Sequence, residues 1–131
     1  MNKLIISCIA VDDEPLALEK MKNFIEKVDY LKLAQVFENP LDAVSFLKEN
    51  PVDLIFLDIQ MEDLTGIQLM QTIRNCPKVV FTTAYDQYAI KGYELEVLDY
   101  LLKPIAFDRF LKAAEKAHAV FSQKKHFQEI E

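Results

Sequence analysis

The sequence predicts an α/β fold in which a parallel β-sheet carries helices on both faces. Short apolar runs alternate along the chain with longer segments whose apolar residues recur at helical spacing, in the order βαβαβαβαβα. The run from Val52 to Asp58 has five apolar residues among its first six, which is typical of a strand buried on both faces. Strands that alternate with helices of this length imply right-handed crossovers and a parallel sheet.

The N-terminal half of the chain contains three predicted strands and two predicted helices. The strands are the apolar runs at residues 4–11, 31–37 and 52–58. Lys32 and Gln35 interrupt the second run and make it the weakest of the three. The helices are expected at residues 15–27 and 40–49. Pro15 and Pro40 suit a first helical turn, and Pro51 ends the second helix because the residue before a proline disfavours helix.

The C-terminal half contains two further strands and three further helices. The strands are expected at residues 78–83 and 97–102, and the helices at residues 67–74, 84–93 and 107–121. The short helix at 84–93 carries Tyr85, Tyr88 and Tyr93, which fit ordinary packing and an interface equally well. We expect one domain over residues 1–122. Residues 123–131 alternate charged with apolar side chains and predict either a helix extension or the start of a linker.

Composition limits the classes of function. The chain has 131 residues, and its net charge of −6 argues against binding of a nucleic-acid backbone by this domain itself. No apolar run approaches the ~20 residues that span a bilayer, and the N-terminal run is interpreted as a strand rather than a signal peptide. Two buried thiols, Cys8 and Cys76, in a reducing cytosol are favoured over a disulfide, so a cytoplasmic location without membrane contact is expected.

Polar residues that suit phosphoryl chemistry follow four of the five predicted strands. Asp12 and Asp13 follow the first strand, Asp58 ends the third, Thr83 ends the fourth and Lys103 follows the fifth. In a parallel sheet these side chains meet at one edge. Three clustered carboxylates without paired His or Cys favour a hard cation such as Mg²⁺. A lysine ammonium and a threonine hydroxyl suit a phosphoryl oxygen, and a carboxylate is a competent nucleophile toward phosphorus.

Simpler interpretations stand beside this one. Asp12-Asp13-Glu14 fits plain helix capping, and Asp58 fits a cap of the next helix. His118 fits packing on the apolar face of the last helix better than a metal site. The alternatives at the level of function are a small phosphatase that works through an aspartyl phosphate, and a non-catalytic α/β binding module. The adjacent spacing of Asp12-Asp13 disfavours the phosphatase, whose chemistry usually uses Asp-x-Asp on one strand.

Four motifs follow the predicted strands: Val11-Asp12-Asp13-Glu14, Leu57-Asp58-Ile59-Gln60-Met61 with Gly66, Thr82-Thr83-Ala84, and Asp99-Tyr100-Leu101-Leu102-Lys103-Pro104-Ile105. On these motifs the chain, from about Leu4 to Phe121, resembles the receiver domain of two-component response regulators. Two segments, Phe81-Thr82-Thr83-Ala84-Tyr85 and Leu98-Asp99-Tyr100-Leu101-Leu102-Lys103-Pro104, are similar to the branch whose receivers precede a LytTR-type DNA-binding domain. The resemblance implies a flavodoxin-like (βα)5 three-layer sandwich with a five-stranded parallel sheet in the order 2-1-3-4-5.

The resemblance also implies the ligands of a metal ion. Asp58 would take a phosphoryl group from the phosphohistidine of a sensor histidine kinase. Asp13 and Asp58 would bind Mg²⁺ directly, together with the backbone carbonyl of Gln60, and Asp12 would hold the ion through water. The domain would catalyse only its own phosphorylation and slow autodephosphorylation, so it is not expected to act as an enzyme on other molecules.

Three further residues have roles implied by the resemblance. Thr83 would close on the phosphoryl oxygen, Lys103 would contact Asp58 and then the phosphoryl group, and Tyr100 would turn inward as Thr83 moves. The changing surface would be the helix at 84–93, the fifth strand and the last helix. A homodimer through that face is expected, and DNA would be contacted only through an output domain absent from this chain.

The loop after Asp58 departs from the family pattern. It contains Met61-Glu62, where the family usually has Met-Pro. Glu62 should leave this loop less rigid and adds a negative charge near the site. Gln60 and Tyr85 fall where the family varies its dephosphorylation rate, and their bulk is expected to shield the acyl phosphate from water.

Overall fold

The computed structural model describes residues 3–85 and 96–130, with side chains described as far as His126. The elements in chain order are β1 (Ile6–Val11), α1 (Pro15–Glu26), β2 (Leu31–Phe37), α2 (Pro40–Glu49), β3 (Leu54–Asp58), α3 (Gly66–Thr72), β4 (Lys78–Thr83), β5 (Asp99–Leu102) and α5 (Phe107–Ile130). The helix predicted at 84–93 lies almost entirely outside the described residues.

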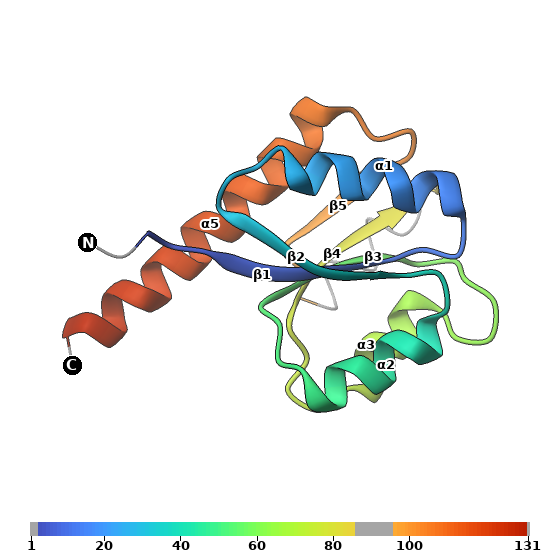
Figure 1. The fold of residues 1–131 in the computed structure, drawn as a ribbon, viewed down its shortest axis with the longest axis horizontal. Coiled ribbons are helices and arrows are strands. Elements are labelled where there is room, and N and C mark those ends of the chain that lie inside the picture. Colours follow the sequence, from blue (N-terminus) through green and yellow to red (C-terminus); the bar gives the residue numbers. More distant parts are fainter. Residues whose placement is uncertain (1–2, 86–95, 131) are drawn as a thin grey trace.

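The five strands form one parallel sheet in the order β2-β1-β3-β4-β5. The predicted α/β class and strand order are therefore confirmed. Helices α1 and α5 cover one face of this sheet, and α2 and α3 cover the other (Figure 1). Because consecutive strand residues point to opposite faces, β1 supplies both layers: Ile6, Cys8 and Ala10 pack with α1 and α5, whereas Ile9 and Val11 pack with α2 and α3.

The central strand β3 is buried on both faces and is apolar except for Asp58 at its end. All five residues of β3 are buried, which confirms the two-sided strand that its composition predicts. The ring of Phe56 on β3 stacks on Phe110 of α5, with centroids 5.1 Å apart, and both side chains are almost completely buried. This contact fixes α5 against the strand that ends in Asp58.

Several element ends differ from the prediction. β1 begins at Ile6 rather than Leu4, because Ile6 is the first residue that pairs with β2, opposite Leu31. β5 begins at Asp99, opposite Val80, rather than at Val97, although the N–H of Leu98 already donates to the carbonyl of Val79 on β4 at 2.8 Å. These limits follow from which residues find a partner on the neighbouring strand, a property that the apolar pattern does not encode.

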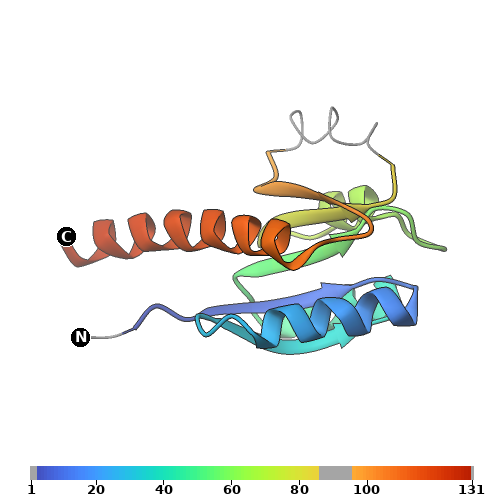
Figure 2. The same cartoon turned by 90° about the horizontal axis from the view of Figure 1, so that it is seen from above.

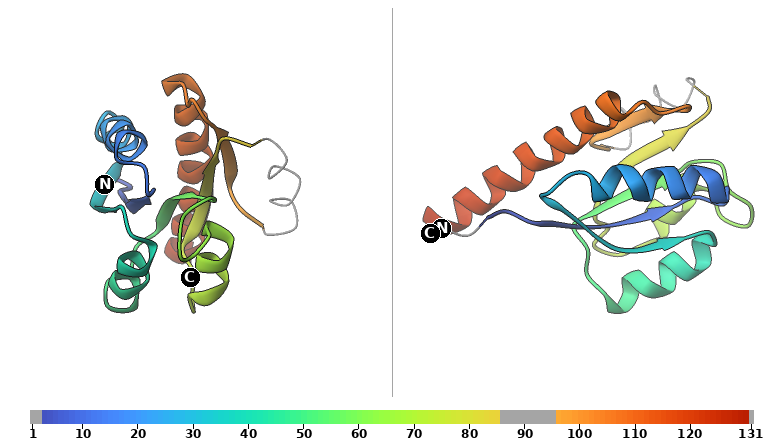
Figure 3. Two further views of the ribbon diagram at one scale, coloured as in Figure 1. Left: turned by 90° about the vertical axis from the view of Figure 1, so that its right-hand side faces the viewer. Right: turned by 45° about the horizontal axis from the view of Figure 1, so that its top comes forward.

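Helices also differ at their ends. α3 begins at Gly66 and ends at Thr72, two residues before the expected end, where Ile73 takes an extended conformation. Its start is fixed by a reciprocal capping box between Thr65 and Gln68. α5 continues as helix to Ile130. Its last turns extend past the sheet, at the same end of the molecule as the start of β1 (Figures 2 and 3).

The chain turns tightly after β3. The Gly66 N–H donates to the carbonyl of Ile59 at 2.8 Å, which closes the loop between β3 and α3. A Cβ atom on Gly66 would lie 2.4 Å from the carbonyl oxygen of Asp58. That oxygen is backbone and cannot move without moving the strand end, so the close approach requires glycine.

We expect Gly66→Ala to destabilise the protein by about 1–3 kcal/mol, the usual cost of overpacking. The direction of this change in stability is informative, because replacing glycine by alanine within a helix otherwise increases the stability. Urea unfolding followed by circular dichroism measures the change. Gln71→Ala, an exposed substitution on the same helix, is the matched control and should leave stability within about 0.5 kcal/mol. A Gly66→Ala variant as stable as wild type would contradict the proposed contact.

Candidate functional site

The carboxyl edge of the sheet brings three aspartates together. Asp12 and Asp13 directly follow β1, and Asp58 is the last residue of β3, the strand paired with β1. One carboxylate oxygen from each of the three lies within 4.8 Å of the others. Asp12 and Asp58 are buried, whereas Asp13 is exposed. The sequence-based grouping of these acids at one edge agrees with this placement.

Lys103 supplies the cationic partner of the cluster. Its Nζ donates to Asp12 Oδ2 at 2.9 Å and lies 3.6 Å from Asp58 Oδ2. Lys103 follows β5, which is separated from β3 by β4 in the sheet. Burial acts to lower the pKa of Lys103, but the hydrogen bond to Asp12 and the charge of Asp58 raise it overall, so the side chain stays protonated.

Asp58 carries the most perturbed carboxylate of the site. Burial and the facing charge of Asp12 raise the pKa of Asp58 to about 7, although Lys103 and a hydrogen bond from the backbone of Gln60 oppose the increase. Its exposed fraction is 5%. The pair Asp12 and Asp58 therefore holds more negative charge than one lysine compensates.

Asp12 is held by two donors. Its Oδ1 accepts the backbone N–H of Glu14 at 2.9 Å, in a turn just before α1. Its Oδ2 is the partner of Lys103. The N-cap residue of α1 is Glu14, which makes no side-chain cap hydrogen bond, so the interpretation of Asp12-Asp13-Glu14 as plain capping is not confirmed.

The hydroxyl groups of Thr83 and Tyr100 make no hydrogen bond to the aspartates of the cluster among the described contacts. Thr83 is buried at the end of β4, and its Oγ1 accepts the backbone N–H of Tyr85 at 3.0 Å. The half-buried ring of Tyr100 packs against Phe81 at 5.5 Å between centroids. The Tyr100 hydroxyl is buried and has no hydrogen-bond partner among the described residues. Neither hydroxyl is therefore held by the carboxylate cluster in this structure.

The sequence matches the family described as response regulator receiver domain over residues 8–115. The match includes every residue of the site described above. The chain belongs to the response regulator receiver domain family.

Relatives and solved structures agree with this receiver domain assignment. The sensory transduction protein LytT of Bacillus anthracis is 35% identical over 114 residues, which cover 85% of this chain and 46% of LytT. The transcriptional regulatory protein YpdB of Escherichia coli K12 is 36% identical over 120 residues, 89% of this chain and 49% of YpdB. The chain thus spans about half the length of the curated relatives it matches, and they are consistent with the LytTR-type branch.

Among solved structures, the response regulatory domain of mrkE from Klebsiella pneumoniae superimposes with a TM-score of 0.82 at 33% identity. The match covers 90% of this chain and 99% of that domain. The REC domain of AraT from Geobacillus stearothermophilus gives a TM-score of 0.76 at 25% identity, over 92% of this chain. The five-stranded receiver fold is therefore common to these proteins.

Sequence reasoning missed an ionic network on β5 of this receiver domain. The guanidinium of Arg109 on α5 donates to both carboxylate oxygens of buried Asp99, at 2.8 and 2.7 Å, and to the carbonyl of Tyr100 at 3.0 Å. Lys116 adds a second cation 3.3 Å from Asp99. Burial acts to raise the pKa of Asp99, but these donors lower it overall. A strand residue and a helix residue ten positions apart give no periodic signal that would reveal the pair.

Other groups named from the sequence take no part in the site. Cys8 is buried, and burial raises its thiol pKa to about 12; Cys76 is also unpaired in the described structure. The ring of His118 packs on Tyr30 with centroids 4.6 Å apart, and its Nδ1 lies 3.3 Å from the hydroxyl of Ser122. Within residues 3–85 and 96–130, no helix combines the length and apolar character needed to cross a membrane.

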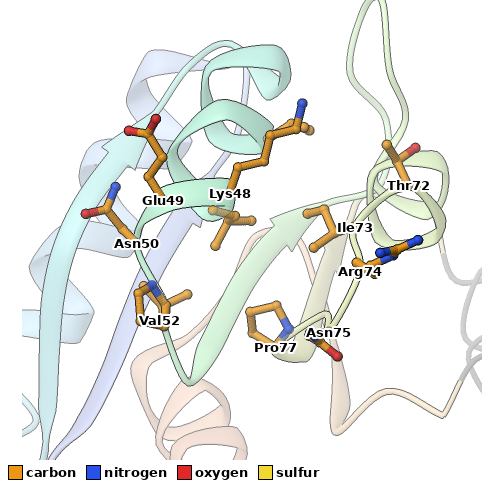
Figure 4. A pocket seen from close by; sticks show the side chains of 12 residues that line it. Lys48, Glu49, Asn50, Val52, Thr72, Ile73, Arg74, Asn75 and Pro77 are labelled. Carbon is orange, nitrogen blue, oxygen red and sulfur yellow. The ribbon is translucent and has the colours of Figure 1, made fainter.

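A cavity of about 480 Å³ opens at the opposite edge of the sheet, beside the ends of α2 and α3 (Figure 4). Lys48 and Arg74 line it from opposite sides. None of the aspartates of the carboxyl edge lines this cavity. The convergent chemistry of the domain is at the carboxyl edge instead.

Without metal, we expect Asp58→Asn to stabilise the domain at pH 8 by about 1–3 kcal/mol. The folded-state pKa of about 7 exceeds the unfolded value, so ionisation of Asp58 costs stability increasingly as pH rises from about 4 to 7. Thermal unfolding in EDTA at a series of pH values measures this. The gain should shrink toward pH 4, whereas Glu19→Gln on the exposed face of α1 should give a difference that does not vary with pH. A gain for Asp58→Asn that is constant with pH would contradict the raised pKa.

Proposed function

We propose that this receiver domain is a phosphorylation switch in which Asp58 accepts a phosphoryl group from the phosphohistidine of a sensor histidine kinase. The observation that carries the proposal is the convergence of Asp12, Asp13 and Asp58 within 4.8 Å, with Lys103 between Asp12 and Asp58. Receiver domains generally act with histidine kinases, which supports this donor.

The donor set of the cluster fits Mg²⁺. All of its side-chain ligands are carboxylate oxygens, which a hard cation prefers. Burial, and after it the charge of Asp12, raises the pKa of Asp58, and a bound cation would relieve both effects. In our proposal Asp13 and Asp58 bind the ion directly with the backbone carbonyl of Gln60, and Asp12 binds it through water. The ion supplies positive charge that neutralises the oxygens of the transferring group.

Phosphoryl transfer then needs little further chemistry from the protein. A carboxylate oxygen of Asp58 forms a bond to phosphorus, the P–N bond to the kinase histidine breaks, and the electron pair stays on the imidazole nitrogen. The product is an acyl phosphate on Asp58. The ammonium of Lys103, already 3.6 Å from Asp58 Oδ2, stabilises the negative charge of the new group.

The switch is a change in the partners of two hydroxyl residues. The Thr83 hydroxyl accepts the Tyr85 N–H in the present structure, and in the phosphorylated state it donates to a phosphoryl oxygen instead. The ring of Tyr100 follows Thr83 inward. Because each state has its own set of contacts, phosphorylation shifts a two-state equilibrium.

The output surface in our proposal comprises residues 84–93, β5 and α5. Two large side chains near its described part are partly open to solvent: Leu102 on β5 is 51% exposed and Tyr85 is 48% exposed. We propose that this face forms a homodimer. The printed descriptions of LytT and YpdB suggest sensory transduction and transcription as the process controlled, through LytTR-type DNA binding by a domain outside these residues, in the cytoplasm.

Incubation with Mg²⁺ and acetyl phosphate should add one phosphoryl group to the wild-type chain and none to Asp58→Asn. Intact-mass spectrometry measures the adduct directly. Asp53→Asn is the matched control, because Asp53 lies at the opposite end of β3 and bonds Ser7 rather than the cluster. It should be phosphorylated like wild type.

An adduct that persists in Asp58→Asn would contradict Asp58 as the acceptor. Release of phosphate from a small phosphate ester over many turnovers would favour the phosphatase alternative. Absence of both an adduct and Mg²⁺ binding would favour the binding-module alternative, in which the acids are structural.

We expect Gln60→Ala and Tyr85→Ala to shorten the lifetime of the acyl phosphate, because their side chains shield it from attacking water. Gln60 lines the rim of the site beside Asp13, and Tyr85 directly follows the Thr83–Ala84 segment. Dephosphorylation of purified phosphoprotein, followed by intact mass after removal of the donor, gives the rate. Gln71→Ala on α3 is an exposed control that should decay like wild type. Faster decay in wild type than in both variants would count against shielding.

A further inference from the structure

Asp13 is held differently from the other two acids of the cluster. Asp12 accepts two donors, from Glu14 and Lys103, and Asp58 lies buried beside Lys103. Asp13 is exposed, and its Oδ2 accepts the backbone N–H of Glu62 at 3.3 Å. This contact joins the segment after β1 to the loop after β3.

The backbone of Glu62 is itself held in place. Its carbonyl accepts the N–H of Leu64 at 2.7 Å, across Asp63, whose φ of 67° lies in the left-handed region. The far end of the loop is closed by the Gly66 N–H to Ile59 contact and by the close approach of Gly66 to Asp58. The Glu62 N–H is therefore presented to Asp13 by a loop that is constrained on both sides.

We infer that the backbone N–H of Glu62 positions Asp13 for metal binding, a role that any residue except proline can fill at this position. The inference rests on the proposed Mg²⁺ site. The contact with the Glu62 N–H restrains the Asp13 carboxylate, one oxygen of which lies within 4.8 Å of oxygens of Asp12 and Asp58, so less side-chain freedom is lost when a cation binds. The Glu62 side chain has a separate effect, because its negative charge acts on the ion whatever the N–H does.

Two substitutions separate the N–H from the charge. Glu62→Gln removes the charge and keeps the N–H, whereas Glu62→Pro removes both. Isothermal titration with Mg²⁺ alone should give binding to Glu62→Pro that is about 3- to 10-fold weaker than binding to Glu62→Gln, the value of one hydrogen bond to a charged acceptor in a partly exposed position. Equal or tighter binding by Glu62→Pro would overturn the inference.

A measurement without metal tests the contact even if proline disturbs the loop. In ¹H–¹⁵N correlation spectra recorded in EDTA, the Glu62 amide proton should move upfield in Asp13→Asn and stay near its wild-type position in Asp12→Asn. The Glu14 amide, which donates to Asp12, should move in Asp12→Asn and serves as the positive control. If the chemical shift of the Glu62 amide proton did not change in Asp13→Asn, the inference would be overturned, and the proposed metal site would be unaffected.

The two failures remain distinguishable. Mg²⁺ binding by wild type, Glu62→Gln and Glu62→Pro with one affinity rejects only the role of Glu62. Lack of Mg²⁺ binding by all three proteins rejects the proposed metal site and the role of Glu62 with it.

Discussion

The constraint on which the structure depends is the burial of Asp58 beside the carboxylate of Asp12 at one edge of the sheet. Asp12 and Asp58 lie on adjacent strands, so the fold brings them together whatever their charges favour. Lys103 is the compensating cation, and it stands closer to Asp12 than to Asp58. One lysine faces three carboxylates, and in the proposed function a divalent cation offsets the excess of negative charge. Without a cation, ionisation of Asp58 costs stability, because the pKa of this carboxyl is raised in the folded protein.

The strand order makes this compensation achievable. Lys103 follows β5, and β4 lies between β5 and β3, so the lysine must reach across β4 to the acids. Thr82 and Thr83 end β4 with short side chains, and Thr82 and Lys103 line one cavity together with Asp12. A large side chain at the end of β4 would stand in the path of the lysine stem. The short side chains of the two threonines thus leave space for Lys103, and the Thr83 hydroxyl also accepts a hydrogen bond.

Most of this arrangement follows from the sequence because periodicity and strand ends are local signals. The two-sided apolar run of β3 and the polar residues at the ends of four strands predict that Asp58 and its partners lie at one edge of the sheet. What the sequence did not reveal depends on tertiary contact. The Arg109–Asp99 pair joins a helix to a strand, and the Glu62 N–H reaches Asp13 only because two loops meet. Backbone donors in particular have no residue type that would mark them.

The missed ionic network bears on how a charge change at Asp58 reaches distant parts of the domain. β5 has only four residues, with Asp99 at one end and Lys103 directly after the other. Arg109 binds Asp99 and the carbonyl of Tyr100, so the strand that precedes the lysine is connected to α5.

A rigid connection alone does not transmit a change at Asp58, because coupling between two sites requires an element with two arrangements. In the proposed function Tyr100 is that element: Arg109 binds its backbone carbonyl, whereas its buried hydroxyl has no hydrogen-bond partner among the described residues. A side chain held only through its backbone can change the position of its ring without breaking the connection between β5 and α5, and that is the kind of change that the proposed phosphorylation of Asp58 would bias.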